Sequence, residues 1–276
     1  MTRCFIIGHP VAHSRSPLVH GEWLREHGLD GSYERVDVPP GELPAFFARF
    51  RAGEFAGGNI TVPHKETVLP YLDSVGPAAL AIGAVNTLWR EGGRLHGDNT
   101  DTLGFRAHLD AMVPGWSERV RVALVLGAGG AARAVAYALR EGGLSSILIV
   151  NRGRERAQDL AATFGAPLET RDWAERHALV GQADLIVNTT SLGMTGQPPL
   201  DLDLAGLRPG TIVNDAVYVP LRPGLLLEAE RRDGIPVDGL GMLLHQAVPG
   251  FERWFGVRPQ VTPALRRKIE EDLGPR

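Results

Sequence analysis

Residues 120–152, VRVALVLGAGGAARAVAYALREGGLSSILIVNR, constrain the fold of this chain more than any other stretch. Residues 120–126 form a nearly unbroken apolar run, which is typical of a parallel strand buried on both faces. The run ends at Gly127-Ala128-Gly129-Gly130-Ala131-Ala132, which fits G-x-G-x-x-A, and a helix is predicted over 131–139 with its N-terminus facing an anion. With the apolar run 147–150, this strand–loop–helix–strand unit predicts dinucleotide binding. The alternative is an ordinary glycine turn.

The end of the second strand indicates which dinucleotide is bound. An NAD site usually places an acidic residue about 20 residues after the first glycine. Here the strand ends in Asn151-Arg152, and Arg154 and Arg156 follow. A carboxylate would repel a 2′-phosphate, whereas arginines offer it charge-assisted hydrogen bonds. We therefore predict NADP rather than NAD; the alternative is that these arginines belong to a solvated helix face.

The bulk composition excludes several classes of protein. The 276 residues allow one large domain or two ordinary ones, and a net charge of −3 gives no sign of a nucleic-acid or membrane partner. The lone Cys4 excludes an intramolecular disulfide and a cysteine-cluster metal site, so we expect no metal. No apolar run resembles a signal peptide or reaches the ~20 residues of a membrane span. We expect a cytoplasmic location.

Lysine is scarce in this chain. Of 29 basic residues only Lys65 and Lys268 are lysines. Arginine stays protonated in proteins, whereas lysine can exchange its proton. Lys65 is therefore a candidate for proton transfer, with chance survival as the alternative. Lys268 lies in a charged C-terminal helix and is interpreted as such a survivor.

The first hundred residues predict a second α/β region. Strands at 3–7, 32–38 and 57–62 alternate with helices at 17–27 and 41–50, which predicts a parallel or mixed sheet. Polar residues gather where the third strand ends, and ligands bind at such ends in open α/β sheets. They are Asn59, Thr61 and Lys65. His64 could act as a base, but packing or capping is favoured.

Two serines follow the first strand. Ser14 and Ser16 could hold a hydroxylated or carboxylated ligand, although Ser16 alone is as simply explained as a helix N-cap. Helical pieces are expected at 66–73 and 77–82. A hairpin with strands at 84–89 and 94–96 then carries Asn86.

The hairpin leads into a helix over 102–112. Asp101 precedes this helix, either as a functional carboxylate or as its N-cap.

In the C-terminal half, a strand at 183–188 leads into small polar residues, including Thr189 and Ser191, that suit an approaching cofactor. A strand at 211–218, a helix at 225–232 and a short strand at 237–240 follow. The amphipathic helix 241–254 carries Gln246 on or beside its buried side.

Taken together, these segments resemble the successive motifs of the shikimate dehydrogenase family. The matching segments, in family order over residues 14–247, are SRSP, NITVPHK, GAVNT, GDNTD, LGAGGAARA, the NR pair with its downstream arginines, NTTSLGM, DAVY and DGLGMLLHQA. The resemblance implies an α/β substrate domain with a mostly parallel sheet, residues 1–101 completed by helices at about 240–276. A Rossmann-type NADP domain, 102–239, is joined to it by helices, with the active-site cleft between them.

The resemblance also implies a reaction and its residues. The reaction is reversible NADPH-dependent reduction of 3-dehydroshikimate to shikimate, in chorismate and aromatic amino-acid biosynthesis. The family's catalytic pair matches Lys65 and Asp101. Its substrate-binding positions match Ser14, Ser16, Thr61, Asn86, Tyr218 and Gln246. Its cofactor positions match Gly127 to Ala131, Asn151, Arg152, Arg156, Ala216 and Gly239.

Two positions depart from the family pattern. Gly153 stands where some members have threonine, and Pro77 where some carry an acid near the cofactor. The expected partner is a small-molecule substrate, and the chain is expected to be a monomer or homodimer.

Three alternatives stay open: a broad-specificity quinate/shikimate dehydrogenase, a non-catalytic sensor of shikimate or NADPH, and another two-domain NADP enzyme such as a methylene-tetrahydrofolate dehydrogenase. Whether Lys65 transfers the proton or mainly stabilises charge is also open.

Overall fold

The structure is a computed structural model that describes residues 1–274. The chain divides into two compact units. The first contains residues 1–101 and 244–272, and the second contains residues 102–243 with Leu273 and Gly274. Helices α4 (Asp101–Met112) and α10 (Leu240–Phe255) each contribute residues to both units.

The first unit contains a mixed six-stranded sheet in the order β2-β1-β3-β5-β6-β4. Three of its five neighbouring strand pairs are parallel, and the pairs β3–β5 and β5–β6 are antiparallel. Its elements are β1 (Thr2–Gly8), α1 (Ser16–Glu26), β2 (Gly31–Asp37), η1 (Pro40–Glu42), α2 (Leu43–Arg51), β3 (Gly57–Ile60), η2 (Leu69–Tyr71), β4 (Ser74–Val75), α3 (Pro77–Ile82), β5 (Thr87–Glu91), β6 (Arg94–Asp98), much of α10, and α11 (Pro263–Leu273).

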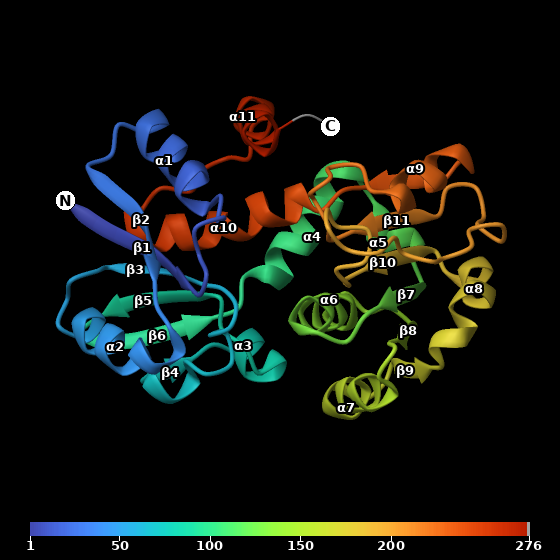
Figure 1. Ribbon diagram of the computed structural model, residues 1–276, viewed down its shortest axis with the longest axis horizontal. Helices are drawn as coiled ribbons and strands as arrows, with labels where there is room; N and C mark the ends of the chain where they lie inside the picture. The colour runs from blue at the N-terminus through green and yellow to red at the C-terminus, as the bar shows by residue number, and fades with distance from the viewer. Residues whose placement is uncertain (275–276) are drawn as a thin grey trace. The chain divides into compact units, whose positions relative to one another are not determined.

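Strand β1 explains how this sheet is covered. Because successive side chains of a strand point to opposite faces, a strand buried on both sides is apolar throughout. Phe5 and Ile7 pack with Phe46 of α2, whereas Cys4 and Ile6 pack with Trp254 of α10. Helices α2 and α3 accordingly cover one face of the sheet, and α1 and α10 the other (Figure 1).

The second unit contains an all-parallel sheet in the order β12-β11-β10-β7-β8-β9. Its elements after α4 are α5 (Trp116–Arg119), β7 (Val122–Leu126), α6 (Gly130–Glu141), β8 (Ser146–Val150), α7 (Arg154–Phe164), β9 (Leu168–Arg171), η3 (Trp173–Glu175), α8 (Arg176–Leu179), η4 (Val180–Gln182), β10 (Leu185–Asn188), β11 (Ile212–Asp215), α9 (Gly224–Arg231) and β12 (Ile235–Val237). Helices α6 and α7 lie on one face of this sheet and α9 on the other (Figure 1). The mixed α/β fold with two mostly parallel sheets is as predicted.

Some predicted elements are wrong. The helix expected over 66–73 is only the 3-10 turn η2, because Pro70 lacks the N–H that an α-helix interior requires and the chain is extended at Leu72. The strand expected over 237–240 lies earlier, at Ile235–Val237. Within residues 1–274, no helix is long and apolar enough to cross a membrane.

Candidate functional site

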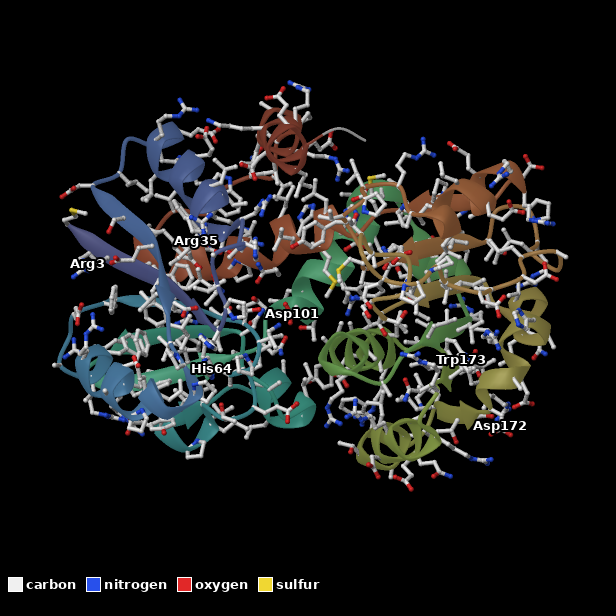
Figure 2. All side chains as sticks on the ribbon, viewed as in Figure 1. Arg3, Arg35, His64, Asp101, Asp172 and Trp173 are labelled. Carbon is white, nitrogen blue, oxygen red and sulfur yellow. The ribbon has the colours of Figure 1, made fainter. Side chains whose placement is uncertain are left out.

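A lysine–aspartate pair lies at the carboxyl-terminal side of the first unit's sheet. Lys65 Nζ donates a 2.7 Å hydrogen bond to Asp101 Oδ2, and Asn86 Nδ2 donates one of 2.8 Å to Asp101 Oδ1. The two side chains of the ion pair are 29% and 15% exposed, so both reach solvent but are largely enclosed. Asp101 stands at the first position of α4 (Figure 2).

Local folding explains why both side chains are held there. The backbone carbonyl of Lys65 accepts a 2.7 Å bond from the Val85 N–H, which fixes the chain after β3. His64 is buried and its Nε2 lies 2.6 Å from the Val38 carbonyl oxygen, so it packs, as favoured from the sequence, rather than facing a substrate. The Asp101 N–H donates to Asn99 Oδ1 at 3.0 Å. Asp101 is itself the first residue of α4, and both of its carboxylate oxygens are engaged by Lys65 and Asn86.

Asn86 connects the pair to its surroundings. Its second amide hydrogen points to Gln246 Oε1 at 3.2 Å, and its own Oδ1 accepts the Thr100 N–H at 2.8 Å. Asn86 and Gln246 are both buried, although they lie 160 residues apart in the chain. Four residues singled out from separate stretches of sequence are thus joined in one hydrogen-bonded network: Lys65, Asn86, Asp101 and Gln246.

Asn59 supports this network from behind. Its Oδ1 accepts the Tyr33 hydroxyl at 2.6 Å, and its amide donates to the Asn86 carbonyl and to Thr87 Oγ1, both at 3.1 Å. With the residue buried and its amide fully engaged, this placement argues against the direct substrate contact expected for Asn59. The His20 ring stacks on the Tyr33 ring, with 4.1 Å between the ring centroids. Burial lowers the His20 pKa to about 3, so the imidazole is neutral.

The two serines occupy the connection between β1 and α1. Ser16 is the first residue of α1 and the N-cap position belongs to Arg15, so the alternative role of Ser16 as N-cap is wrong. Arg35 of β2 clamps this connection by donating two hydrogen bonds, of 3.0 and 2.6 Å, to the Ser14 carbonyl (Figure 2). A Cβ on Gly8, just upstream, would come within 2.5 Å of Thr61 Cγ2, so only glycine fits beside Thr61.

The glycine loop of the second unit has the shape of an anion cradle. Gly127 has φ +111°, and a Cβ there would lie 2.5 Å from Thr189 Oγ1, so this position requires glycine. A Cβ on Gly129 or Gly130 would meet no atom of residues 1–274 within 4 Å, which leaves open space before the N-terminus of α6. Within the described part of the chain no side chain caps α6, so its first N–H groups face that space. A pyrophosphate fits this geometry.

The three arginines after β8 differ in whether they form an ion pair. Arg154 pairs with Asp172 at 2.8 Å, on the outside of the unit where Figure 2 labels Asp172. Arg152 and Arg156 are exposed and form no ion pair with any residue in the described part of the chain. Asn151 donates from Nδ2 to the Gly153 carbonyl at 2.8 Å, which closes the turn that carries Arg152. Two of the three guanidinium groups therefore remain available for a phosphate.

The remaining predicted residues of this unit lie beyond the carboxyl ends of β10, β11 and β12. Thr189 Oγ1 donates to the Leu126 carbonyl at 2.6 Å, and Ser191 next to it is exposed. A Cβ on Gly239 would lie 2.3 Å from the Ala216 carbonyl oxygen, so the segments after β11 and β12 touch. Tyr218 lies half-buried on the segment after β11.

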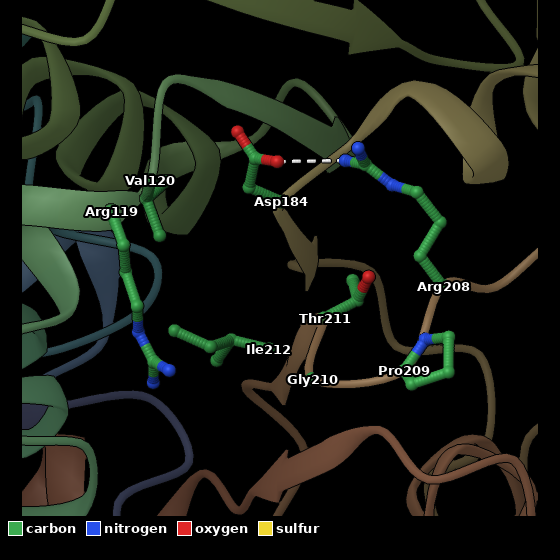
Figure 3. Close-up of a pocket in the computed structure, with 8 residues that line it drawn as sticks. All are labelled: Arg119, Val120, Asp184, Arg208, Pro209, Gly210, Thr211 and Ile212. Atoms are coloured by element: carbon green, nitrogen blue, oxygen red, sulfur yellow. Dashed lines mark hydrogen bonds and ion pairs between the residues drawn. The ribbon is translucent and has the colours of Figure 1, made fainter.

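A cavity of about 260 Å³ elsewhere in the second unit carries no comparable chemistry (Figure 3). It is lined by Arg119, Val120, Asp184, Arg208, Pro209, Gly210, Thr211 and Ile212, near the amino ends of β7, β10 and β11. Asp184 is already bound by Arg208 at 2.7 Å and by the N–H groups of Arg121 and Val122. Ligands of open α/β sheets bind at the opposite, carboxyl ends.

Sequence reasoning missed three positioning side chains. Arg35 and Tyr33 were hidden in a strand, SYERVDV, whose alternation only indicates a half-buried strand. Asn188, which is buried at the end of β10, was noted only as the last residue of its strand. No residue type or spacing in the sequence separates these side chains from ordinary strand residues.

Comparison with known proteins supports one family. Residues 6–88 match the model of the shikimate dehydrogenase substrate binding domain, 115–194 that of shikimate/quinate 5-dehydrogenase, and 239–267 that of the shikimate 5′-dehydrogenase C-terminal domain. The shikimate dehydrogenase (NADP(+)) of Azorhizobium caulinodans is 55% identical over 273 residues, 99% of this chain and 97% of that protein.

Solved structures agree. Shikimate 5-dehydrogenase from Thermus thermophilus, in complex with NADP(H) and shikimate, is 39% identical with a TM-score of 0.88, covering 99% of this chain and 100% of that one. Quinate dehydrogenase from Corynebacterium glutamicum, in complex with NAD, is 31% identical with a TM-score of 0.90, covering 98% and 99%. The chain therefore belongs to the shikimate dehydrogenase family.

Proposed function

We propose that this chain catalyses the reversible, NADPH-dependent reduction of 3-dehydroshikimate to shikimate, as an oxidoreductase of aromatic amino-acid biosynthesis. The observation that carries the proposal is the Lys65–Asp101 pair at 2.7 Å, held by Asn86 within a buried amide network. Close relatives named shikimate dehydrogenase (NADP(+)) support the choice of substrate and cofactor.

The first unit binds the substrate. Ser14 and Ser16 hold the carboxylate with their hydroxyls, on a connection that Arg35 keeps in place. Thr61, Asn86 and Gln246 bind ring hydroxyls, and the 3.2 Å Asn86–Gln246 bond is exchanged for bonds to the substrate. Tyr218 of the second unit is a further proposed substrate contact, whereas Asn59 is proposed to hold Asn86 and Tyr33 in place.

Lys65 handles the proton. NADPH, when bound, supplies the hydride that reduces the ketone carbon. As that carbon gains the hydride, Lys65 Nζ gives a proton to the ketone oxygen, and the product alcohol results. Before the transfer, the ammonium also stabilises negative charge growing on that oxygen. Asp101 fixes the direction of Nζ and compensates its charge, and the partial exposure of Lys65 lets solvent restore the proton.

The second unit selects and holds the cofactor. Gly127 to Ala131 and the uncapped N-terminus of α6 receive the pyrophosphate, because backbone N–H groups face an open space there. Arg152 and Arg156, with Asn151, bind the adenosine 2′-phosphate. Thr189, Ser191, Ala216 and Gly239 line the nicotinamide side. This arrangement favours NADP over NAD, because a 2′-hydroxyl gives the arginines no charge to neutralise.

The cytoplasmic location and the monomeric or homodimeric state stay predictions. A broad-specificity quinate/shikimate enzyme remains the second candidate, because the quinate dehydrogenase of Corynebacterium glutamicum has the same fold.

The test is turnover by the purified chain. With shikimate and NADP⁺, NADPH absorbance is expected to rise, and the reverse reaction is expected to consume NADPH. Shikimate binding measured by calorimetry without any turnover would instead make the chain a sensor.

A further inference from the structure

Two buried polar residues end neighbouring strands of the second unit and face each other in register. Asn188 is the last residue of β10 and Asp215 the last of β11, and both side chains are 0% exposed. Asn188 Nδ2 donates to Asp215 Oδ1 at 2.9 Å, and the Ala216 N–H donates to the Asn188 carbonyl at 2.8 Å. Burying two polar side chains costs stability unless their hydrogen bonds are made, so their partners indicate their purpose.

Asn188 binds the segment that follows its own strand. Its Oδ1 accepts both the N–H and the hydroxyl of Thr190, at 3.0 and 2.7 Å, and its Nδ2 also reaches the Leu192 carbonyl at 3.2 Å. Thr190 Oγ1 in turn accepts the Leu192 N–H at 3.1 Å. One side chain therefore determines the path of residues 189–192, which include the proposed cofactor contacts Thr189 and Ser191.

Asp215 binds the segment after the neighbouring strand. Its Oδ1 accepts the Val217 N–H at 3.0 Å in addition to the Asn188 amide. Residues 216–218 carry the proposed contacts Ala216 and Tyr218. The next strand is tied in the same manner, because Asn214 Nδ2 donates to the Val237 carbonyl at 3.1 Å. Three adjacent segments at the proposed nicotinamide side are thus held by side chains at the ends of the strands.

The second oxygen of Asp215 distinguishes this pair from ordinary buried polar residues. Asp215 Oδ2 is buried and has no hydrogen-bond partner among residues 1–274, and the residue borders a cavity of about 240 Å³. None of the other residues lining that cavity is charged; they include Gly193, Gln197, Leu200, Pro223 and Leu225. Burial raises the Asp215 pKa to about 7, against the bonds from Val217 and Asn188 that lower it. A neutral carboxyl fits these surroundings.

We propose that Asn188 and Asp215 form a positioning pair that sets the segments 189–192 and 216–218 for the nicotinamide end of the cofactor. This inference rests on the proposed NADP-dependent function. Neither side chain touches the cofactor. They act through Thr190, Leu192, Ala216 and Val217, whose backbone they hold.

The test compares variants in both cofactor binding and turnover. Asn188→Ala is expected to raise the NADP⁺ KM and to lower kcat, each about tenfold, because small misplacements at a reaction centre are costly. The shikimate KM should change less than the NADP⁺ KM, since all proposed substrate contacts except Tyr218 belong to the first unit. Asp215→Asn keeps the acceptor oxygen and mimics the neutral acid, so it should retain most activity, whereas Asp215→Leu should behave like Asn188→Ala.

Leu179→Ala is the matched control. Leu179 is buried in the same unit's core, so its truncation destabilises the unit without touching either segment. If it shifts the NADP⁺ KM as much as Asn188→Ala does, or if Asn188→Ala only lowers the melting temperature, the pair is structural and the inference is overturned. Should Asn188→Ala fail to fold, Thr190→Val removes the same hydroxyl bonds at a half-buried position and must give the same KM and kcat changes.

Measurements on the wild-type chain distinguish failure of the proposed function from failure of the positioning-pair inference. NADPH binding, followed by the fluorescence of NADPH, needs no turnover. If wild-type protein binds NADPH but does not oxidise shikimate, the proposed function fails, whereas a weakened affinity in Asn188→Ala still supports the pair. If wild-type protein turns over and the Asn188→Ala values match it, the inference fails while the function stands.

Discussion

The two units hold their candidate sites in different ways. In the first, side chains bind side chains: Lys65, Asp101, Asn86 and Gln246 form one connected network. In the second, the proposed contacts are backbone N–H groups, glycine positions open to space, and exposed arginines. A site that moves a proton needs groups fixed at defined distances. A site for a large anion can bind it with backbone N–H groups and with the charged ends of exposed arginine side chains.

The difference predicts different sensitivities. Substitutions in the first network should affect kcat strongly, because each member holds the next. Substitutions of the exposed arginines should affect cofactor affinity and leave the chemical step intact. The following predictions go from the largest expected effect to the smallest.

Lys65→Ala should lower kcat by about 10²- to 10⁴-fold, the usual contribution of a positioned acid or base. NADPH affinity should not change. Lys65→Arg keeps the charge but cannot transfer a proton, so a partial recovery of kcat would show that Lys65 acts mainly by electrostatics. Lys268→Ala, the other lysine, pairs with Glu22 on the surface and should leave all rates unaltered. Initial rates measured at saturating NADP⁺ decide between these outcomes.

Asp215→Asn should change how stability depends on pH. Because the folded-state pKa of Asp215 is raised to about 7, the unfolded chain releases this proton first, so wild-type stability falls as pH rises from about 4 to about 7. The full difference is on the order of 4 kcal/mol above pH ~7. Urea unfolding of both proteins across this pH range measures it. A constant difference between the two proteins would contradict burial of a neutral acid.

The double substitution Arg152→Ala with Arg156→Ala should raise the KM for NADP⁺ by at least about 100-fold, since each of the two charge-assisted bonds contributes ~1.5–3 kcal/mol. Neither the KM for NAD⁺ nor kcat should change appreciably. Arg154→Ala is the internal control, because Arg154 is already paired with Asp172. Equal losses for both cofactors would show that these arginines do not read the 2′-phosphate.

Asn59→Ala should lower kcat/KM for shikimate about tenfold and destabilise the fold by ~1–3 kcal/mol, because the Asn86 carbonyl and the Tyr33 hydroxyl lose buried partners. Tyr33→Phe removes one of these bonds and should have a smaller effect of the same kind. If Asn59 instead contacts substrate, its loss will raise the shikimate KM without loss of stability. Paired kinetics and thermal unfolding distinguish the two roles.

The sequence predicted the second unit's central strands and glycine loop closely, because backbone approach, tight turn and helix start each demand a particular residue there. The sequence says less where the same residue type serves two purposes. An asparagine at a strand end looks the same in the sequence whether it contacts a ligand, as expected for Asn59, or binds neighbouring residues, as Asn59 does through its bonds with Tyr33 and Thr87.

The sequence pattern also did not predict elements at the edge of a sheet or in turns. Strand β9, LETR, was not foreseen because it lies at the sheet edge and buries only Leu168. The network itself could not be derived from spacing, since Asn86 and Gln246 meet only through the path of α10 back to the first unit. Long-range pairing of this kind depends on tertiary packing.

The most direct test of the division between the units crosses two substrates with two cofactors. Initial rates of reduced-cofactor formation by the wild-type chain are measured with shikimate or quinate, each with NADP⁺ or NAD⁺. Fast turnover is expected only with shikimate and NADP⁺. On this account the side-chain network of the first unit selects the substrate, and Arg152 and Arg156 of the second unit select the cofactor. Comparable rates with quinate or with NAD⁺ would contradict this division.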